Sequence, residues 1–298
     1  MASMQKDEGV KTITFCLVGN LFLLLLKGTV GLIVGSSALK ADAVNSAGDV
    51  MSSFVVLLGL RYAIKPRDED HHYGHGKMEA LVSLVVGIMI LISIGFLLRD
   101  IVLAIINKSP VPPSLFALVA ALLSVIVKII MFKKTNAAGK RLASIAIVTN
   151  AKDHKNDIFA TSGAILSIAL ALVGQHFRIS FLLLYSEPVI AAVISIFIVK
   201  TAAEIITEAS KMLLDAAPEK EVVSSIREIT VRTAGVSKLD WVKCRKMGRG
   251  LLTDVAIEVN GHISVEEGHA IGDEVKSAIM FEFPDVIDVL VHINPNEK

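Results

Sequence analysis

Two apolar stretches of the chain each carry two polar side chains that can bind a metal, spaced four residues apart. The first stretch holds Asn45 and Asp49, and the second holds Asp153 and Asp157. A spacing of four places both members of a pair on one face of an α-helix. Carboxylates inside a membrane span are costly unless a cavity, a cation or a proton meets them, so the two pairs indicate an ion pathway.

The composition around these pairs is that of a membrane protein. Of the 298 residues, 53% are apolar and 20% are charged, and the charges cluster between long apolar runs. A soluble core is not patterned in this way. Each run is near or above the ~20 residues needed to cross a bilayer. The six predicted spans are residues 12–35, 38–64, 79–106, 114–132, 143–173 and 182–203.

Basic residues predict the orientation of these spans. If the N-terminus lies inside, nine Lys and Arg residues flank the spans on the inner side and four on the outer side. This excess favours both termini in the cytoplasm. The inner residues are Lys6, Lys11, Lys65, Arg67, Lys77, Lys133, Lys134, Lys140 and Arg141, and the outer ones are Lys40, Arg99, Lys108 and Arg178.

This orientation puts the two polar pairs at one depth. At a rise of ~1.5 Å per residue, Asn45 lies ~7 Å and Asp49 ~13 Å below the outer boundary. Across a ~30 Å core, Asp153 lies ~12 Å and Asp157 ~6 Å below the same boundary. Antiparallel helices would then set Asn45 opposite Asp157. Asp49 would face Asp153, and one cation could reach all four side chains.

A different placement of the fifth span gives an alternative. The helix could enter the lipid only at Ile158, which would leave Asp153 and Asp157 as solvated charges among the inner headgroups. The segment from Ile158 to Val173 is, however, only 16 residues long, slightly short of the ~20 needed to cross. Two lysines within apolar runs, Lys27 and Lys128, could either snorkel to the interface or face the bundle.

The loop between the second and third spans adds a dense run of ligand-type residues. It reads Asp68-Glu69-Asp70-His71-His72-Tyr73-Gly74-His75-Gly76-Lys77-Met78-Glu79. Together with the segments Ala41–Asp49 and Asp153–Asp157, this loop resembles the cation diffusion facilitator family of divalent-metal transporters. The resemblance covers nearly the whole chain. It implies a homodimeric exporter that binds a divalent metal between its second and fifth helices and exchanges it for protons by alternating access.

The resemblance also maps a transport site onto four positions, which are Asn45, Asp49, Asp153 and Asp157. The family usually builds this site from Asp and His, whereas no histidine occurs among the four here. Carboxylates and an amide carbonyl favour hard cations such as Mn2+, whereas imidazole or thiolate would favour Zn2+ or Cu. Within the family, the Asn-Asp-Asp-Asp set resembles that of the manganese exporters. Export of Zn2+ or Fe2+ by the same site remains an alternative.

A second metal site is predicted in the loop. The resemblance suggests Asp68, His71 and His75 as its ligands, and Asp/His clusters of this kind hold zinc or another cation. Gly74 and Gly76 would let the backbone fold close around His75. The alternative is a solvated, pH-sensitive loop without a metal.

After residue 209 the pattern changes from membrane spans to a small soluble domain, so residues 1–209 are predicted to form the membrane domain and residues 210–298 a cytoplasmic one. The order αββαβ with a Gly-rich hairpin at Gly248 to Gly250 predicts a ferredoxin-like α+β fold. Its predicted elements are the helix Lys220–Thr233, the strands Lys238–Lys246 and Leu251–Val259, the helix Val265–Phe281 and the strand Val286–Ile293.

The resemblance places a third metal site in this domain. Its positions would be Asp240, Asp254, His269 and His292, and a metal there would bridge the two subunits of a dimer. Exposed acidic residues without a metal are the alternative.

Other classes of function fit the sequence less well. The chain has no nucleotide-binding loop, which disfavours transport driven by its own ATP hydrolysis. An intramembrane aspartyl protease could use two facing Asp residues, but it would not need four ligands or a His-rich loop. A metal sensor would show no flux. The sequence therefore predicts a multi-pass transporter of the inner or plasma membrane, not an enzyme, whose partners are divalent metal ions, protons and lipid. It predicts no cofactor beyond these metals and no nucleic acid.

Overall fold

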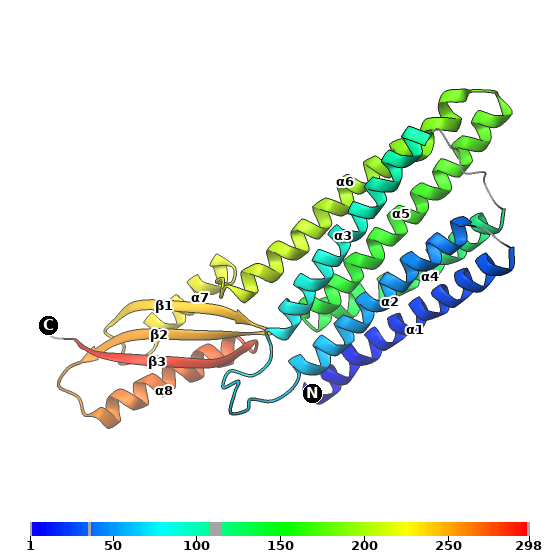
Figure 1. Ribbon diagram of the computed structural model, residues 1–298. Coiled ribbons are helices and arrows are strands. Elements are labelled where there is room, and N and C mark those ends of the chain that lie inside the picture. The colour runs from blue at the N-terminus through cyan, green and yellow to red at the C-terminus, as the bar shows by residue number, and fades with distance from the viewer. Residues whose placement is uncertain (1, 35–36, 108–114, 297–298) are drawn as a thin grey trace. The chain divides into compact units, whose positions relative to one another are not determined.

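The computed structural model describes residues 2–34, 37–107 and 115–296. Lys108 and the outermost residues predicted for the first and fourth spans, 35 and 114, lie outside this description. The chain divides into two compact units, Met1–Ala209 and Ser210–Lys298. The elements, shown in Figure 1, are α1 (Ala2–Val34), α2 (Ser37–Ala63), α3 (Met78–Asn107), α4 (Leu115–Arg141), α5 (Ile145–His176), α6 (Ser180–Leu213), α7 (Lys220–Arg232), β1 (Lys238–Met247), β2 (Gly250–Asn260), α8 (Val265–Glu282) and β3 (Val286–Asn296).

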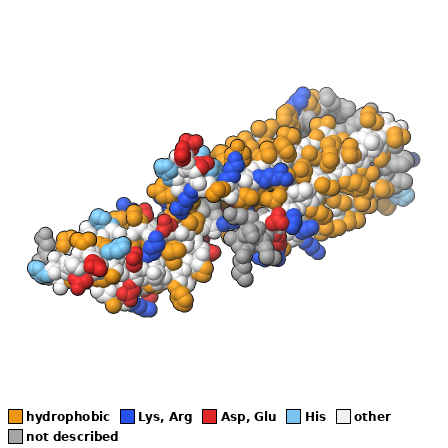
Figure 2. Space-filling view, turned by 90° about the horizontal axis from the view of Figure 1, so that it is seen from below, with side chains coloured by type: hydrophobic (Ala, Val, Ile, Leu, Met, Phe, Trp, Pro, Cys, Tyr) orange, Lys and Arg blue, Asp and Glu red, His pale blue; other side chains and the backbone are white. Residues whose placement is uncertain are grey.

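The first unit is a bundle of long helices. Five of its described helices, α1, α2, α3, α5 and α6, contain stretches long and apolar enough to cross a membrane. Large apolar side chains cover its outer surface, as the mostly orange part of Figure 2 shows. Such a surface would be costly in water and suits lipid. Among the most exposed are Val18, Ile33, Phe96 and Ile196.

The helices that carry the two polar pairs are neighbours inside this bundle. α2 packs against α1, α3 and α5, and α5 also packs against α4 and α3. The apolar core between them includes Val56 and Leu60 of α2, Val86 of α3 and Ile147 of α5. Close approach of α2 and α3 requires Gly59, because a Cβ there would lie 2.4 Å from both methyl groups of Val82.

The start of α5 is fixed by a side-chain cap. The Ser144 hydroxyl accepts a hydrogen bond from the backbone N–H of Ile147 and donates one to the carboxylate of the buried Glu79 at the start of α3. From this cap α5 continues without a break for 32 residues. The segment that contains Asp153 and Asp157 is therefore an internal part of one long helix, positioned from its first turn.

The second unit has the predicted αββαβ order. Its three strands lie in the order β1-β2-β3. β1 and β2 are antiparallel, and β2 and β3 are parallel. Side chains of α7, α8 and all three strands share one core, so both helices cover the same face of the sheet. Fully buried members of this core are Ile226, Val255, Ile257, Val275 and Ile279. The predicted fold class, a helical membrane bundle followed by a ferredoxin-like domain, is confirmed.

Candidate transport site

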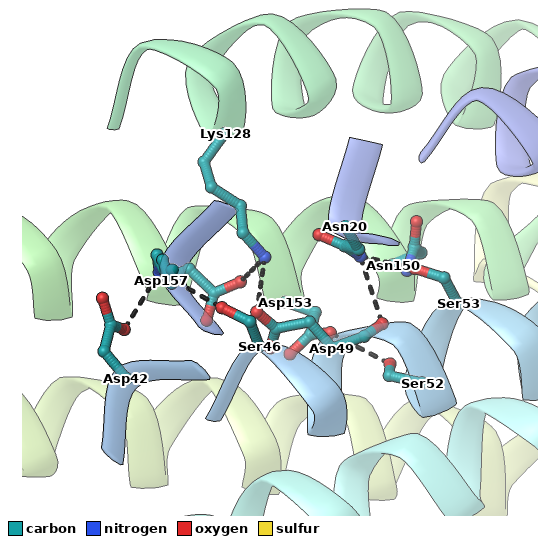
Figure 3. Close-up of polar contacts among 11 residues, drawn as sticks. Asn20, Asp42, Ser46, Asp49, Ser52, Ser53, Lys128, Asn150, Asp153 and Asp157 are labelled. Carbon is teal, nitrogen blue, oxygen red and sulfur yellow. Dashed lines mark hydrogen bonds and ion pairs between the residues drawn. The ribbon is translucent and has the colours of Figure 1, made fainter. Parts of the chain in front are cut away.

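Two of the four predicted transport residues contact a lysine inside the bundle, and a third lies beside them (Figure 3). The ammonium nitrogen of Lys128, from α4, lies 2.8 Å from Oδ2 of Asp49 and 2.5 Å from Oδ2 of Asp157. Lys128 is only 3% exposed. A buried ammonium that donates to two carboxylates links α4 to both α2 and α5.

Asp153 completes the group from the neighbouring turn of α5. Its Oδ2 accepts a hydrogen bond of 3.0 Å from the hydroxyl of Ser52 on α2, and the residue is 8% exposed. Burial and the ion pair of Asp157 speak against the alternative in which both residues are solvated headgroup charges. Lys128 thus joins a carboxylate of α2 to one of α5, and Ser52 of α2 holds the second carboxylate of α5.

A layer of neutral polar side chains lies next to the carboxylates. The amide of Asn20 on α1 donates to the backbone oxygen of Asp49 at 3.1 Å and to the hydroxyl of Ser53 at 2.9 Å, and the amide of Asn150 on α5 donates to the same hydroxyl at 3.4 Å. All are buried. This network fixes the rotation of α1, α2 and α5 around the site.

This layer was not predicted from the sequence, although the spacing of its residues was visible there. Ser53 follows Asp49 by four residues and Asn150 precedes Asp153 by three, so each shares a helical face with a carboxylate. Asn20 offers a weaker signal, because it is a single amide in a long apolar helix.

Asn45 is placed differently from the three carboxylates. It lies one turn before Asp49 on α2, but it is exposed. The structure thus brings Asp49, Asp153 and Asp157 together around Lys128 and turns Asn45 outward. His154, which follows Asp153 on α5, is fully buried. Neither of its ring nitrogens has a hydrogen-bond partner within the described residues.

A second buried lysine pairs with an aspartate that lies two turns before Asp49 on α2. Lys27 of α1, 4% exposed, contacts Oδ1 of Asp42 at 2.9 Å and the hydroxyl of Ser46 at 3.2 Å. Lys27 and Lys128 both face the interior of the bundle and do not snorkel to the interface. Lys27 joins α1 to α2 and touches none of the four predicted transport residues by these contacts.

The three predicted loop residues lie together. Nδ1 of His71 is 3.0 Å from Oδ1 of Asp68, and Nε2 of the buried His75 is 3.4 Å from Oδ2 of Asp68. Within the described parts of the chain, these are the one group of three His, Cys, Asp or Glu residues whose ligand atoms all lie within 4.8 Å of one another. The backbone at Gly74, in the turn before His75, has a φ of +84°. Glycine adopts such a positive φ readily because it has no Cβ.

The charge state of Asp68 suits a cation. Desolvation acts to raise its pKa, but hydrogen bonds from the ring and the backbone of His71 outweigh it and hold the pKa of Asp68 below its usual value. The carboxyl is therefore ionised throughout the physiological range. A bound cation would find one carboxylate and two imidazoles, a set typical of zinc.

The four residues predicted for the cytoplasmic site are distributed over two sides of the second unit. Asp240 accepts hydrogen bonds from Asn294 at 3.0 Å and Lys238 at 3.1 Å, and in that order these partners lower the pKa of Asp240. On the same open face, His292 is in register with Ala256, two residues from Asp254. His269 lies on α8, which covers the opposite face, and its nearest acidic partner is Asp273 at 3.4 Å. One subunit does not bring these four side chains together.

Models of two protein-family domains match the chain. The model of the cation efflux transmembrane domain matches residues 13–214, and that of the cation efflux protein cytoplasmic domain matches residues 218–296. The chain belongs to the cation efflux family. The family resemblance drawn from the sequence is therefore confirmed, and this cation efflux protein is a multi-pass membrane protein.

Several relatives of this cation efflux protein align over almost their whole length. The manganese efflux system protein MneP of Bacillus subtilis (strain 168) is 32% identical over 99% of both chains. MneS, named as a manganese efflux system protein of the same organism, is 32% identical over 93% of this chain and 92% of its own. A solved MamM CTD chain aligns with 26% of this chain and 95% of its own, at 23% identity and a TM-score of 0.26.

Proposed function

We propose that the protein exports Mn2+ from the cytoplasm in exchange for protons, by alternating access of a site on α2 and α5. The observation that carries the proposal is the meeting of Asp49, Asp153 and Asp157 inside an apolar helical bundle. Buried carboxylates that are not paired structurally with equal positive charge suit a divalent cation. The names of MneP and MneS support manganese as the cargo.

Oxygen ligands support the same choice of metal. Three carboxylates form a hard site that favours Mn2+ over the softer cations, although the Irving–Williams order lets Zn2+ bind even oxygen sites tightly. Zn2+ or Fe2+ is the alternative cargo. When the metal leaves, the carboxylates need another positive charge in a water-poor site, and protons supply it. This requirement couples metal export to proton entry.

The membrane setting follows from the same proposal. The inner excess of Lys and Arg supports a cytoplasmic location for both termini and the second unit, in a protein of the inner or plasma membrane. The working form is a homodimer.

Transport can be tested with purified protein in proteoliposomes that carry a pH gradient. We expect uptake of Mn2+ that depends on the gradient and is accompanied by proton movement in the opposite direction. Uptake of several metals should be compared in the same vesicles. Flux of Zn2+ or Fe2+ without flux of Mn2+ would change the cargo, and the absence of any metal flux would contradict the proposed function.

The loop residues Asp68, His71 and His75 are proposed as a separate zinc site, outside the transport path. We expect the His75→Ala variant to lose one bound Zn2+ per chain while it keeps metal flux, because the ligand set falls to two. Equilibrium dialysis with elemental analysis measures the bound zinc. His72→Ala is the matched control, since His72 lies in the same loop outside the group of three. Equal zinc loss in both variants, or in neither, would remove this site.

A metal on the cytoplasmic unit is proposed to bridge two subunits, because the four predicted ligands lie apart in one. Asp240, Asp254, His269 and His292 would be its sources, not all from one chain. We expect Mn2+ or Zn2+ to raise the thermal midpoint of the isolated unit, residues 210–298, by mass action and to draw two copies together. Calorimetry and sedimentation measure both effects. A midpoint that does not respond to millimolar Mn2+ or micromolar Zn2+ would eliminate the bridge.

A further inference from the structure

Lys128 occupies the position where a transported cation would bind two of its carboxylates. Its ammonium contacts Oδ2 of Asp49 and Oδ2 of Asp157 at 2.8 and 2.5 Å. A hard divalent cation binds carboxylate oxygens at about 2.0–2.6 Å. The ammonium and the metal therefore compete for the same oxygen atoms, and two cations held between them would repel each other.

The charges of the site make its carboxylates depend on a nearby cation. Asp49, Asp153 and Asp157 carry −3 when ionised, and the ammonium of Lys128 reduces this to −2 when no metal is bound. When a divalent cation displaces the ammonium from Asp49 and Asp157, the carboxylates and the metal together carry −1.

We propose that Lys128 is a tethered counter-cation of the transport site. Its ammonium holds Asp49 and Asp157 when no metal does, and an arriving metal must displace it from both. This inference rests on the proposed function. The flexible four-carbon stem of a lysine lets its charged end withdraw along α4 while its Cα stays in place.

Displacement gives Lys128 a defined effect on binding and release. An incoming metal loses affinity, because it must break two buried ion pairs before it binds. A bound metal is released faster, because the ammonium is tethered beside the carboxylates and can replace it. The lysine thus lowers the affinity of the site for the metal and raises the rate of metal release. A lysine that only links α4 to α2 and α5 would affect the yield of folded protein but not the affinity of the folded fraction.

The test is Lys128→Met in the full-length protein, which removes the charge and keeps an unbranched side chain. We expect its Kd for Mn2+ to fall at least about tenfold, together with a lower KM and a lower kcat. The Kd is measured in detergent from the electron paramagnetic resonance signal of free Mn2+, and KM and kcat are measured in proteoliposomes at one fixed pH. An unchanged or higher Kd in the folded variant overturns the proposal.

Two further variants keep the test decisive. Lys128→Arg retains the charge, and its planar fork binds carboxylates more firmly than an ammonium does. We expect its Kd to rise about tenfold, and an unchanged or lower Kd would overturn the proposal even if Lys128→Met does not fold. Lys27→Met is the matched control, because Lys27 is equally buried and also pairs with an aspartate, but with Asp42. Its Kd should stay within about twofold of the wild type, and a decrease equal to that of Lys128→Met would count against the proposal.

The outcomes separate this inference from the proposed function. If the wild-type protein moves no metal, the proposed function fails. If the wild type moves Mn2+ but neither Lys128 variant changes the Kd in the expected direction, the transporter stands and the tethered counter-cation is wrong.

Discussion

Replacing Asp49 or Asp157 by asparagine should lower metal flux at least about a hundredfold, since loss even of a residue that only supports a ligand costs about 10–100-fold. Each substitution removes one charge and one strong oxygen ligand from a site that water hardly reaches, so the cation is left under-coordinated. Asparagine is preferred to alanine because its carbonyl oxygen can still accept a hydrogen bond from Lys128. The protein should therefore stay folded and dimeric. Flux of Mn2+ into proteoliposomes, together with size-exclusion chromatography, measures both properties.

The matched control is Asp42→Asn, which changes the same residue type on the same helix. Asp42 pairs with Lys27 and lies two turns before Asp49 on α2. We expect its flux to stay within about threefold of the wild type, because no transport ligand is lost. Normal flux in both Asp49→Asn and Asp157→Asn would refute the assigned pathway. A loss in Asp42→Asn as large as in these two would show that the effect is not specific to the site.

The elements of the fold were predictable because their signals are local. Long apolar runs gave the six helices of the first unit, and alternating patterns bounded by glycines gave the strands of the second. The predicted strand Leu251–Val259, for example, differs by one residue at each end from β2, Gly250–Asn260. Hydrogen bonding between strands extends such elements by a residue or two beyond their apolar pattern.

The contact of Lys128 with the carboxylates could not be predicted in the same way. A single lysine in an apolar run fixes neither the rotation of its helix nor the neighbours it faces, and both snorkelling and burial satisfy its charge. Only the packing of α4 against α5 decides between them. Spacing by four did predict that Asp153 and Asp157 share a face, because that property belongs to one helix alone.

Asn45 and His269 were grouped with other ligands from the sequence, but the structure places them apart from those residues. Asn45 shares a helical face with Asp49 by its spacing, yet it is exposed. A helical face is about 100° wide, so residues at its edges can point out of the bundle. His269 was grouped with three strand residues by resemblance. The helix that carries it covers the opposite face of the sheet from Asp254 and His292. Tertiary arrangement, not residue type, separates these side chains.

Asn45→His should increase zinc transport relative to manganese by about tenfold, because imidazole replaces an oxygen ligand and produces the mixed Asp/His set that suits tetrahedral Zn2+. This result requires that Asn45 enters the site during transport, although it is exposed in the structure. The measurement is competitive flux of Zn2+ and Mn2+ into the same vesicles, each metal quantified separately.

Asn45→Asp is the matched control for this experiment. It keeps an oxygen ligand of nearly the same size, so the ratio of zinc to manganese flux should stay within about twofold of the wild type even if the absolute flux changes. A ratio that rises only with histidine would identify Asn45 as a ligand that discriminates against zinc. If the wild type already moves Zn2+ faster than Mn2+ and Asn45→His leaves the ratio unchanged, manganese is not the selected cargo. The buried carboxylates and their lysine would then still define a divalent-metal pathway, but its selectivity would have to come from residues other than Asn45.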